Sequence, residues 1–364
     1  MTVLARHLGV ITGLLLAVWL GGCADTRYYA QSVFGHLQLM QAARPIDDWL
    51  QDEAAPDALK QRLNLAREMR RFAVAELNLP DNASYHRYAD LKRRHVVWNV
   101  VAAPQFSLTL KTWCFLVAGC VGYRGYFSES EAQALADSLR AEGLEVSVYG
   151  VPAYSTLGWM NWMGGDPLLN TFIHYPEGEL ARMVFHELSH QVLYVADDTA
   201  FNESFATAVE RLGGAHWLQQ QASPLARAEY AAFDARRQKF RALTRATRDR
   251  LGLIYKENSP LAHTNKALEA MKKVAYKEFK ESYAALKTSW GGYSAYDAWV
   301  AQANNASFGA QAAYDDYVPG FEALFEREGR DWTRFYDAVR QLAKFPARER
   351  QDLLKHWALQ QQHE

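Results

Sequence analysis

The chain has 364 residues, of which 49% are hydrophobic and 13% aromatic. This length and apolar content predict one large folded unit or two closely packed ones. The formal net charge at pH 7 is -1, with acidic and basic residues interspersed. The sequence has no basic stripe that would indicate a nucleic-acid partner, and no acidic tail that would indicate disorder.

The first 22 residues have the composition of an export signal. Arg6 supplies a positive charge, residues 8–20 are apolar, and Leu20-Gly21-Gly22-Cys23 follows. This string resembles the lipobox of bacterial lipoproteins, which implies cleavage before Cys23 and a lipid on that cysteine. The alternatives are a Sec signal with an incidental cysteine and an uncleaved anchor helix, although the apolar run is short for a membrane span.

The resemblance to lipoproteins implies a location. The lipid would hold the protein in the bacterial cell envelope, facing the periplasm, while the folded body keeps the character of a soluble protein. Ala24 follows the cysteine where Asp would direct retention, and this weakly favours the outer membrane.

Cys114 and Cys120 are the other two cysteines. In an exported protein, an even pair so close in sequence is consistent with a disulfide. Two buried free thiols are the alternative, because cysteine is often a core residue. A zinc ribbon would need a second cysteine pair, and the sequence has none.

Hydrophobic periodicity predicts helices at both ends of the chain and strands between them. Helices are expected over 33–50 with a break at Pro45, over 57–77, and from a capping box at 128–131 to Glu142. Strands are expected over 95–102, 113–117, 123–127 and 145–149, followed by an irregular aromatic loop over 151–176. Beyond residue 200 the predicted helices are 201–212, 224–255, 263–290, 293–303, 308–328 (broken near Pro319), 331–342 and 347–357.

The most informative motif is His186-Glu187-Leu188-Ser189-His190, within a helical pattern that starts after Pro176. Residues four apart lie on one face of an α-helix, about 6 Å apart along its axis. Two imidazoles there can reach one metal ion, and Glu187 emerges beside them, within reach of a metal-bound water. The alternative is an amphipathic helix with two incidental histidines.

A catalytic zinc site needs a third protein ligand and an open position for water. One class of zinc enzyme continues as HExxHxxGxxH, and Leu193 and Ala196 at its glycine and third histidine positions exclude that class. Another class takes a glutamate from a second helix downstream. Glu203 fits, because a helix capped by Asp198 or Thr199 would run back beside the first and place Glu203 opposite the histidines.

Other side chains compete for the third position. Asp197 and Asp198 fall in the turn, and His216 lies further along the second helix. Glu210 lies two turns beyond Glu203 on the same face, where it could hydrogen-bond a ligand histidine. Glu203 itself could instead be a surface glutamate, favoured at a helix start by the macrodipole.

His186-Glu-Leu-Ser-His190 followed by Asn202-Glu203-Ser-Phe-Ala206 resembles the glutamate-zincin arrangement, HExxH then NExxA. More closely, the chain resembles the predicted-aminopeptidase family of bacterial lipoproteins over nearly all of its mature length. The strings that carry this resemblance are Trp98-Asn-Val, Trp113-Cys-Phe-Leu-Val-Ala-Gly-Cys120, Tyr123-Arg-Gly-Tyr-Phe, Ala153-Tyr-Ser-Thr-Leu-Gly-Trp159, Asp166-Pro, the zinc motif and Asn304-Asn-Ala306. The link from Trp159 to Asp166 is longer than in the family.

The resemblance implies a predominantly helical α+β fold, with a zincin-like core in which a small mixed or antiparallel sheet lies beside the HExxH helix. It divides the chain into a signal peptide (1–22), an N-terminal helical segment (23–95), a catalytic core (96–215) and a helical C-terminal region packed on the core (216–364). One Zn²⁺ per chain would be held by His186, His190 and Glu203.

The implied reaction is hydrolysis of a peptide bond by a zinc-activated water, with Glu187 as the base that passes the proton to the leaving amine. Tyr314 is the candidate for a second oxyanion donor, because glutamate-zincins often use a Tyr or His on a later helix; the alternative is a buried core tyrosine. Strand 145–149 and the 151–166 loop would flank the cleft and bind substrate by strand addition. Glu210, Asp166 and Asp315 are candidates for binding the substrate's α-ammonium.

The expected function is a membrane-anchored zinc aminopeptidase, with a peptide or protein as substrate and the membrane as a partner through the lipid. Two alternatives remain open, a zinc endopeptidase of the envelope and a non-catalytic zinc-binding envelope lipoprotein. The intact Glu187 argues against the second, because a structural zinc site has no need for a general base.

Overall fold

The computed structural model describes residues 23–115, 119–156, 161–256 and 265–361, with the backbone alone at 23–25, 312–315 and 361. Residues 1–22, the predicted signal peptide, lie outside this description, as do Trp159 and the side chains of Cys23, Tyr314 and Asp315. Within it the fold is predominantly helical, with small sheets of two or three strands, which confirms the expected α+β class.

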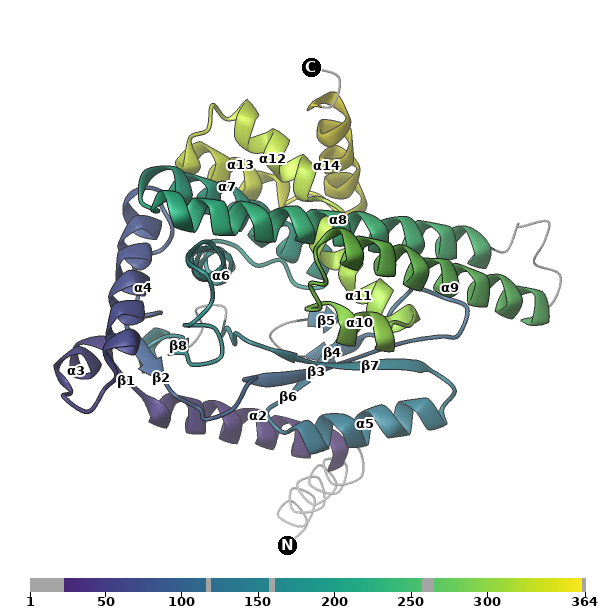
Figure 1. The fold of residues 1–364 in the computed structure, drawn as a ribbon, viewed down its shortest axis with the longest axis horizontal. Coiled ribbons are helices and arrows are strands. Elements are labelled where there is room, and N and C mark those ends of the chain that lie inside the picture. The colour runs from purple at the N-terminus through teal and green to yellow at the C-terminus, as the bar shows by residue number, and fades with distance from the viewer. Residues whose placement is uncertain (1–22, 116–118, 157–160, 257–264, 362–364) are drawn as a thin grey trace, which may run out of the picture.

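An antiparallel sheet in the order β6-β3-β7 forms the middle layer. β3 (Val97–Ala103) pairs with β6 (Arg124–Tyr126) on one side and along its whole length with β7 (Glu145–Val151) on the other. Successive side chains of a strand point to opposite faces. Val100 therefore packs against α5 (Glu129–Ala141), whereas Val101 packs towards α11 (Asn305–Asp315). Figure 1 shows α5 below the sheet and α11 above it.

A second, mixed sheet was not predicted from the sequence. β2 (Arg87–Ala89) pairs antiparallel with β1 (Ala43–Pro45) and parallel with β8 (Leu168–Leu169). These strands are two or three residues long, too short to show an alternation of apolar and polar residues. A separate hairpin joins β4 (Trp113–Phe115) to β5 (Gly119–Val121).

Three helices lie at the N-terminal end of the described residues. α2 (Cys23–Ala42) lies along the lower side of the molecule in Figure 1, and β1, which contains Pro45, separates it from α3 (Ile46–Gln51). α4 (Asp57–Ala75) buries the apolar face expected from its periodicity. Among the described residues, no helix combines the length and the apolar character needed to cross a membrane.

The HExxH helix, α6 (Glu177–Ser189), packs against α7 (Thr199–Gln220). Leu180, Val184 and Leu188, at four-residue spacing, are fully buried. α7 continues well past the predicted end at residue 212. The glycine pair after it resembles a helix stop, but here it permits close packing, since a Cβ on Gly214 would lie 2.7 Å from Cγ of Arg182.

The remaining helices lie at the top and on the right of the molecule in Figure 1. α8 (Pro224–Tyr255) and α9 (Asn265–Ser289) pack together, and with α10 (Asp297–Gln302) and α11 they enclose a separate apolar cluster. α12 (Val318–Arg327) begins with Pro319 in its first turn, where proline is tolerated, and packs on α7. The last two helices are α13 (Trp332–Leu342) and α14 (Ala347–Gln361).

A buried ion pair connects α14 to the start of α7. Arg350 Nη2 lies 2.6 Å from Asp198 Oδ2, and both side chains are at least 90% buried. Arg350→Ala should lower the free energy of unfolding by about 3–5 kcal/mol, because Asp198 remains as a buried charge without its cation. Denaturant unfolding followed by circular dichroism measures the change. As a control, Arg340→Ala removes an exposed pair with Asp337 and should change it by less than about 1 kcal/mol; equal effects of the two would contradict the prediction.

Candidate metal centre

The two histidines of the HExxH motif, at the end of α6, direct their Nε2 atoms towards the same point. His186 lies in the last turn of the helix, and His190 is the residue after its end. His190 still has helical backbone angles, φ -60° and ψ -20°, so the one-turn relation between the imidazoles is kept. Their Nε2 atoms are 3.2 Å apart.

The chain then reverses into α7, and two side chains of α7 fix the reversal. Asn202 accepts a hydrogen bond from Val195 N at 2.8 Å and donates one from Nδ2 to Val195 O at 2.7 Å. Asp198 caps the helix by accepting from Phe201 N at 3.1 Å. Glu203, the residue after Asn202, is thereby turned towards α6.

Glu203 completes a triangle of ligand atoms. Its Oε2 lies 3.4 Å from His186 Nε2 and 3.9 Å from His190 Nε2. Zn²⁺ bonds to nitrogen and oxygen at about 2.0–2.2 Å, so neighbouring ligands of a tetrahedral ion are about 3.3–3.6 Å apart. The separations of 3.2 and 3.4 Å are close to this range, and the third, 3.9 Å, is somewhat longer. The three side chains have the donor set of a zinc site, and among the described residues they form a group that could hold a metal ion.

A second carboxylate holds the other side of His186. Glu210 Oε2 lies 3.0 Å from His186 Nδ1, and its other oxygen accepts from Arg182. Arg182 is 3% exposed, so this ion pair is buried. The bond at Nδ1 orients the imidazole and leaves Nε2 for the metal, the arrangement in which an outer carboxylate strengthens a metal ligand. Glu210 thus has the contact expected from its position two turns beyond Glu203.

The buried acids and bases shift one another's pKa values. Burial alone would lower the pKa of His186, but the hydrogen bonds that its ring donates to Glu203 and Glu210, with the charges of these carboxylates, outweigh it and raise that pKa well above its usual value. Burial would raise the pKa of Glu210, yet the charge of Arg182 lowers it to about 2. Burial would raise the pKa of Glu203, yet His190 and the hydrogen-bonded His186 together lower it. Both carboxylates are therefore held ionised, the form needed by a ligand and by the partner of a ligand.

Glu187 lies in a different environment on the same helix. It lines the cavity with the three ligand side chains, and burial raises its pKa to about 7. The carboxylates of Glu203, Asp166 and Glu210 add to this shift. A carboxylate with a pKa near neutrality can both accept and return a proton.

The cavity has a volume of about 520 Å³. The metal-centre residues form one wall, and Val97 and Asn99 of β3 lie on the wall made by the sheet. α2 contributes Tyr28 and Ser32. The start of the predicted loop, residues 151–155, also lines the cavity, next to the end of β7.

Three predicted ligand competitors have other partners. Asp197 accepts from Cys120 N at 2.6 Å, Asp198 pairs with Arg350, and His216 bonds to Gln220 at 2.6 Å. None belongs to the His186–His190–Glu203 group within the described residues.

The candidates for binding the α-ammonium are not equally available. Asp166 is 1% exposed and accepts bonds from Thr156 N, Thr156 Oγ1 and Ser155 Oγ, so it holds the cavity-lining loop in place. Glu210 lines the cavity but is occupied by His186 and Arg182. The side chain of Asp315 lies outside the described residues.

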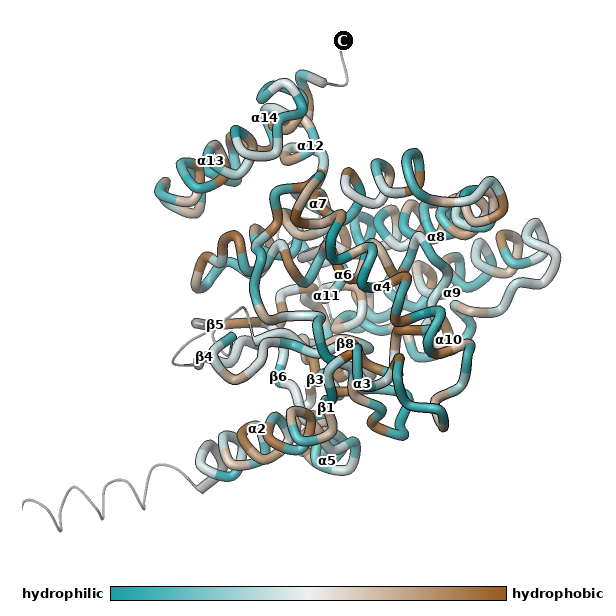
Figure 2. The backbone as a smooth tube through the Cα atoms, turned by 90° about the vertical axis from the view of Figure 1, so that its left-hand side faces the viewer, coloured by the Kyte–Doolittle hydropathy of each residue, from teal (hydrophilic) through white to brown (hydrophobic). Residues whose placement is uncertain are grey.

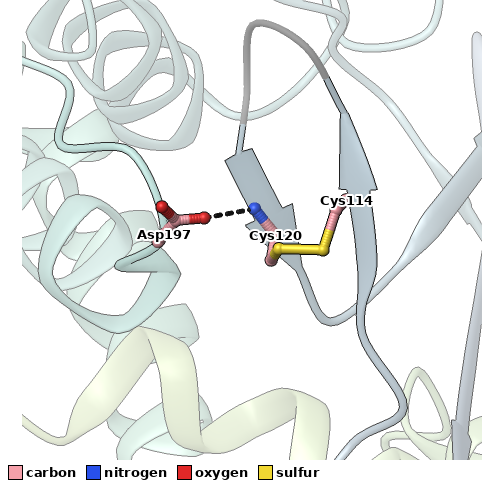
Figure 3. Close-up of a disulfide and its surroundings, with 3 residues drawn as sticks. All are labelled: Cys114, Cys120 and Asp197. Atoms are coloured by element: carbon pink, nitrogen blue, oxygen red, sulfur yellow. Dashed lines mark hydrogen bonds between the residues drawn. A yellow bond between two sulfur atoms is a disulfide. The ribbon is translucent and has the colours of Figure 1, made fainter.

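The structure joins Cys114 and Cys120 in a disulfide between β4 and β5 (Figure 3). The hairpin rests on the α6–α7 reversal through the bond from Cys120 N to Asp197. Gly119 has a φ of 70°, and a Cβ there would lie 2.6 Å from Asp197 Oδ1, so glycine is required on both counts. The hairpin therefore braces the loop that positions Glu203.

Sequence reasoning missed two residues of the centre. Asn202 was part of the NExxA motif, but its double bond to Val195 appears only when the reversal is seen. Arg182 precedes His186 by one helical turn, and an arginine on the apolar face of α6 was a signal that it would be buried with a carboxylate.

Residues 27–354 match the protein family described as "Putative aminopeptidase". The chain belongs to this family. The match contains the whole metal centre and every wall of the cavity, and membership in the aminopeptidase family suggests peptidase activity. No curated protein and no solved structure matches the chain.

Glu203→Ala should abolish stoichiometric zinc binding, because two imidazoles alone leave the site without its third protein ligand. Metal analysis of the purified chain measures this, and circular dichroism checks that the fold is kept. Glu322→Ala is the matched control, since Glu322 is partly buried and pairs with Arg211 of α7. Zinc retained at one per chain in Glu203→Ala would contradict the assignment.

Proposed function

We propose that this member of the family is a zinc-dependent aminopeptidase. The observation that carries the proposal is the convergence of His186, His190 and Glu203 at close to the spacing of tetrahedral zinc ligands, in one cavity with Glu187. Membership in the aminopeptidase family supports the reaction class. A structural zinc site would not need a carboxylate of near-neutral pKa directed into the same cavity.

In this proposal the residues of the cavity have three roles: zinc binding, proton transfer and positioning of a ligand. His186, His190 and Glu203 would hold Zn²⁺, which when bound polarises the scissile carbonyl and the attacking water. Glu187 accepts the proton of that water and returns it to the nitrogen of the leaving amine. Glu210, ionised by Arg182, holds the His186 ring in the orientation that leaves Nε2 towards the metal.

A second donor to the oxyanion would lower the barrier further. Tyr314 of α11 remains the candidate from the sequence. Tyr123 and Tyr194 also line the cavity, and burial followed by the charge of Glu203 raises the pKa of each. Their phenols are therefore protonated at neutral pH and able to donate, so they compete with Tyr314 for this role.

The size of the cavity supports cleavage at a peptide end. Its volume of about 520 Å³ lies in the range of small-molecule sites, about 300–1,000 Å³. α2 and the 151–155 segment contribute Tyr28, Ser32 and Tyr154 to its lining. A cavity of this size suits the few terminal residues of a peptide better than a long stretch of one.

The sequence at the N-terminus supports an anchor for the enzyme. The apolar run over 8–20 and the Leu20-Gly21-Gly22-Cys23 string support a lipid on Cys23, a location in the bacterial envelope and a periplasm-facing body. Mass spectrometry of the mature N-terminus tests this: an unmodified Cys23, or a chain that still carries residues 1–22, would refute the lipid anchor.

Glu187→Gln should lower peptide hydrolysis by about 10²–10⁴-fold, because the amide cannot accept the proton of the attacking water. Zinc content should stay at one per chain, since Glu187 is not among the three ligand residues. Glu177→Gln, in the first turn of the same helix, is the control and should keep wild-type turnover. Unchanged hydrolysis in Glu187→Gln would refute the role of this residue.

Acetylation of the substrate separates the two kinds of peptidase. Peptides with free N-termini should be shortened from that end, and their acetylated counterparts should resist cleavage, because an aminopeptidase recognises the α-ammonium. Mass spectrometry of the products measures both. Internal cleavage of the acetylated peptides at an equal rate would identify an endopeptidase and refute the aminopeptidase assignment.

A further inference from the structure

One face of α2 is apolar and open to solvent. Its exposed fractions are 40% for Tyr29, 58% for Val33, 65% for Phe34 and 38% for Leu37. At about 100° per residue these four residues, here called the α2 stripe, fall within an arc of about 140° and form a continuous surface over about two turns. In Figure 2, α2 lies at the edge of the molecule and carries hydrophobic residues along its length.

The opposite face of α2 fixes the orientation of the stripe. A Cβ on Gly35 would lie 2.2 Å from the ring of Phe127, so the helix backbone lies directly on that ring. Gln31 accepts a bond from Phe127 N, and Arg27 pairs with Glu131 of α5. These contacts hold α2 in place, so the helix cannot rotate about its axis to bury the stripe without detaching from the rest of the protein.

The stripe also lacks charge. Between Arg27 and Arg44 the sequence contains no Asp, Glu, Lys or Arg. His36 is 7% exposed, and burial lowers its pKa, so it adds no charge at neutral pH. Among the residues whose side chains the structure describes, the other large exposed hydrophobic side chains lie on several different elements, which is ordinary for a protein. They are Trp162, Leu225, Leu253, Val274, Phe345 and Leu359.

The sequence before α2 indicates what covers the stripe. The apolar run over residues 8–20 and the candidate lipidation site Cys23 both come within 21 residues before Tyr29, at the N-terminal end of this helix. A second copy of the chain is a poorer fit, because specific protein interfaces bury about 800 Å² per partner, more than four partly exposed side chains on one helix provide.

We propose that the α2 stripe docks on the surface of a lipid bilayer, with its apolar side chains among the acyl chains. The stripe is uncharged and consists of two aromatic and two aliphatic residues. Helices that lie in the membrane interface present this kind of face to lipid. α2 also lines the cavity through Tyr28 and Ser32. Docking would therefore hold the cavity roughly one helix diameter, about 10–12 Å, from the membrane. This inference goes beyond the peptidase proposal and does not depend on it.

The test places a fluorophore on the stripe. The full chain carrying Phe34→Cys is labelled with an NBD maleimide and mixed with vesicles of phosphatidylethanolamine and phosphatidylglycerol containing a shallow spin-labelled lipid. Leu253→Cys is the matched control, because Leu253 is 63% exposed on α8. The unsubstituted chain, treated identically, gives the background from Cys23. Val33→Cys repeats the measurement at a second stripe position.

NBD fluorescence at positions 33 and 34 should be roughly twofold or more lower on spin-labelled vesicles than on the same vesicles without the spin label. Fluorescence at position 253 should change little. No quenching at 33 and 34, or equal quenching at all three positions, would overturn the proposal. Concentration-dependent self-quenching at 34 without lipid would overturn it in favour of a second copy. Peptide hydrolysis by the same labelled chains is measured in parallel, so a failure of the peptidase assignment is seen separately.

Discussion

The short reversal between α6 and α7 holds the two halves of the candidate metal centre in register. Asn202 ties its own helix to Val195 with two hydrogen bonds, and Asp198 both caps α7 and pairs with Arg350 of α14. The disulfide hairpin contacts the same loop at Asp197. Because a shift of 1 Å is large compared with the tolerance of a metal–ligand bond, the loop must be held from several sides, and it is.

A buried electrostatic chain extends behind this loop. His186 bonds to Glu210, Glu210 bonds to Arg182, and Arg182 lies among Glu179 and Asp234. Arg237 of α8 reaches Glu179 at 2.7 Å, so three helices share one network. Burial raises the pKa of Glu179 to about 7, while Arg182 keeps that of Glu210 at about 2. Arg182 is therefore placed beside Glu210, the partner of the candidate ligand His186, and keeps that carboxylate ionised.

The cavity combines elements from distant parts of the chain. α2 is both a wall of the cavity and the helix that directly follows the apolar N-terminal sequence. In this arrangement the proposed anchor and the proposed catalytic site are separated by a single helix. If both proposals hold, the same twenty residues of α2 would set the position of the protein relative to the membrane and line its substrate site.

The sequence by itself determined the helices, the HExxH spacing and the choice of Glu203 as the favoured third residue. Each depends on contacts within one helix or between two consecutive ones, so the order of residues contains the information. It failed at β1, β2 and β8, whose two or three residues carry no detectable period, and at the end of α7, where Gly213 and Gly214 serve close packing.

Only the tertiary structure decided how the site is supported and enclosed. Asp198 could be assigned to Arg350 only when two segments 152 residues apart along the chain were brought together. Arg182 could be assigned to Glu210 only when the packing of α6 on α7 showed which side chains meet. The walls supplied by α2 and the sheet come from still other segments. Such partners are selected by packing in three dimensions, which leaves no regular spacing in the sequence to read.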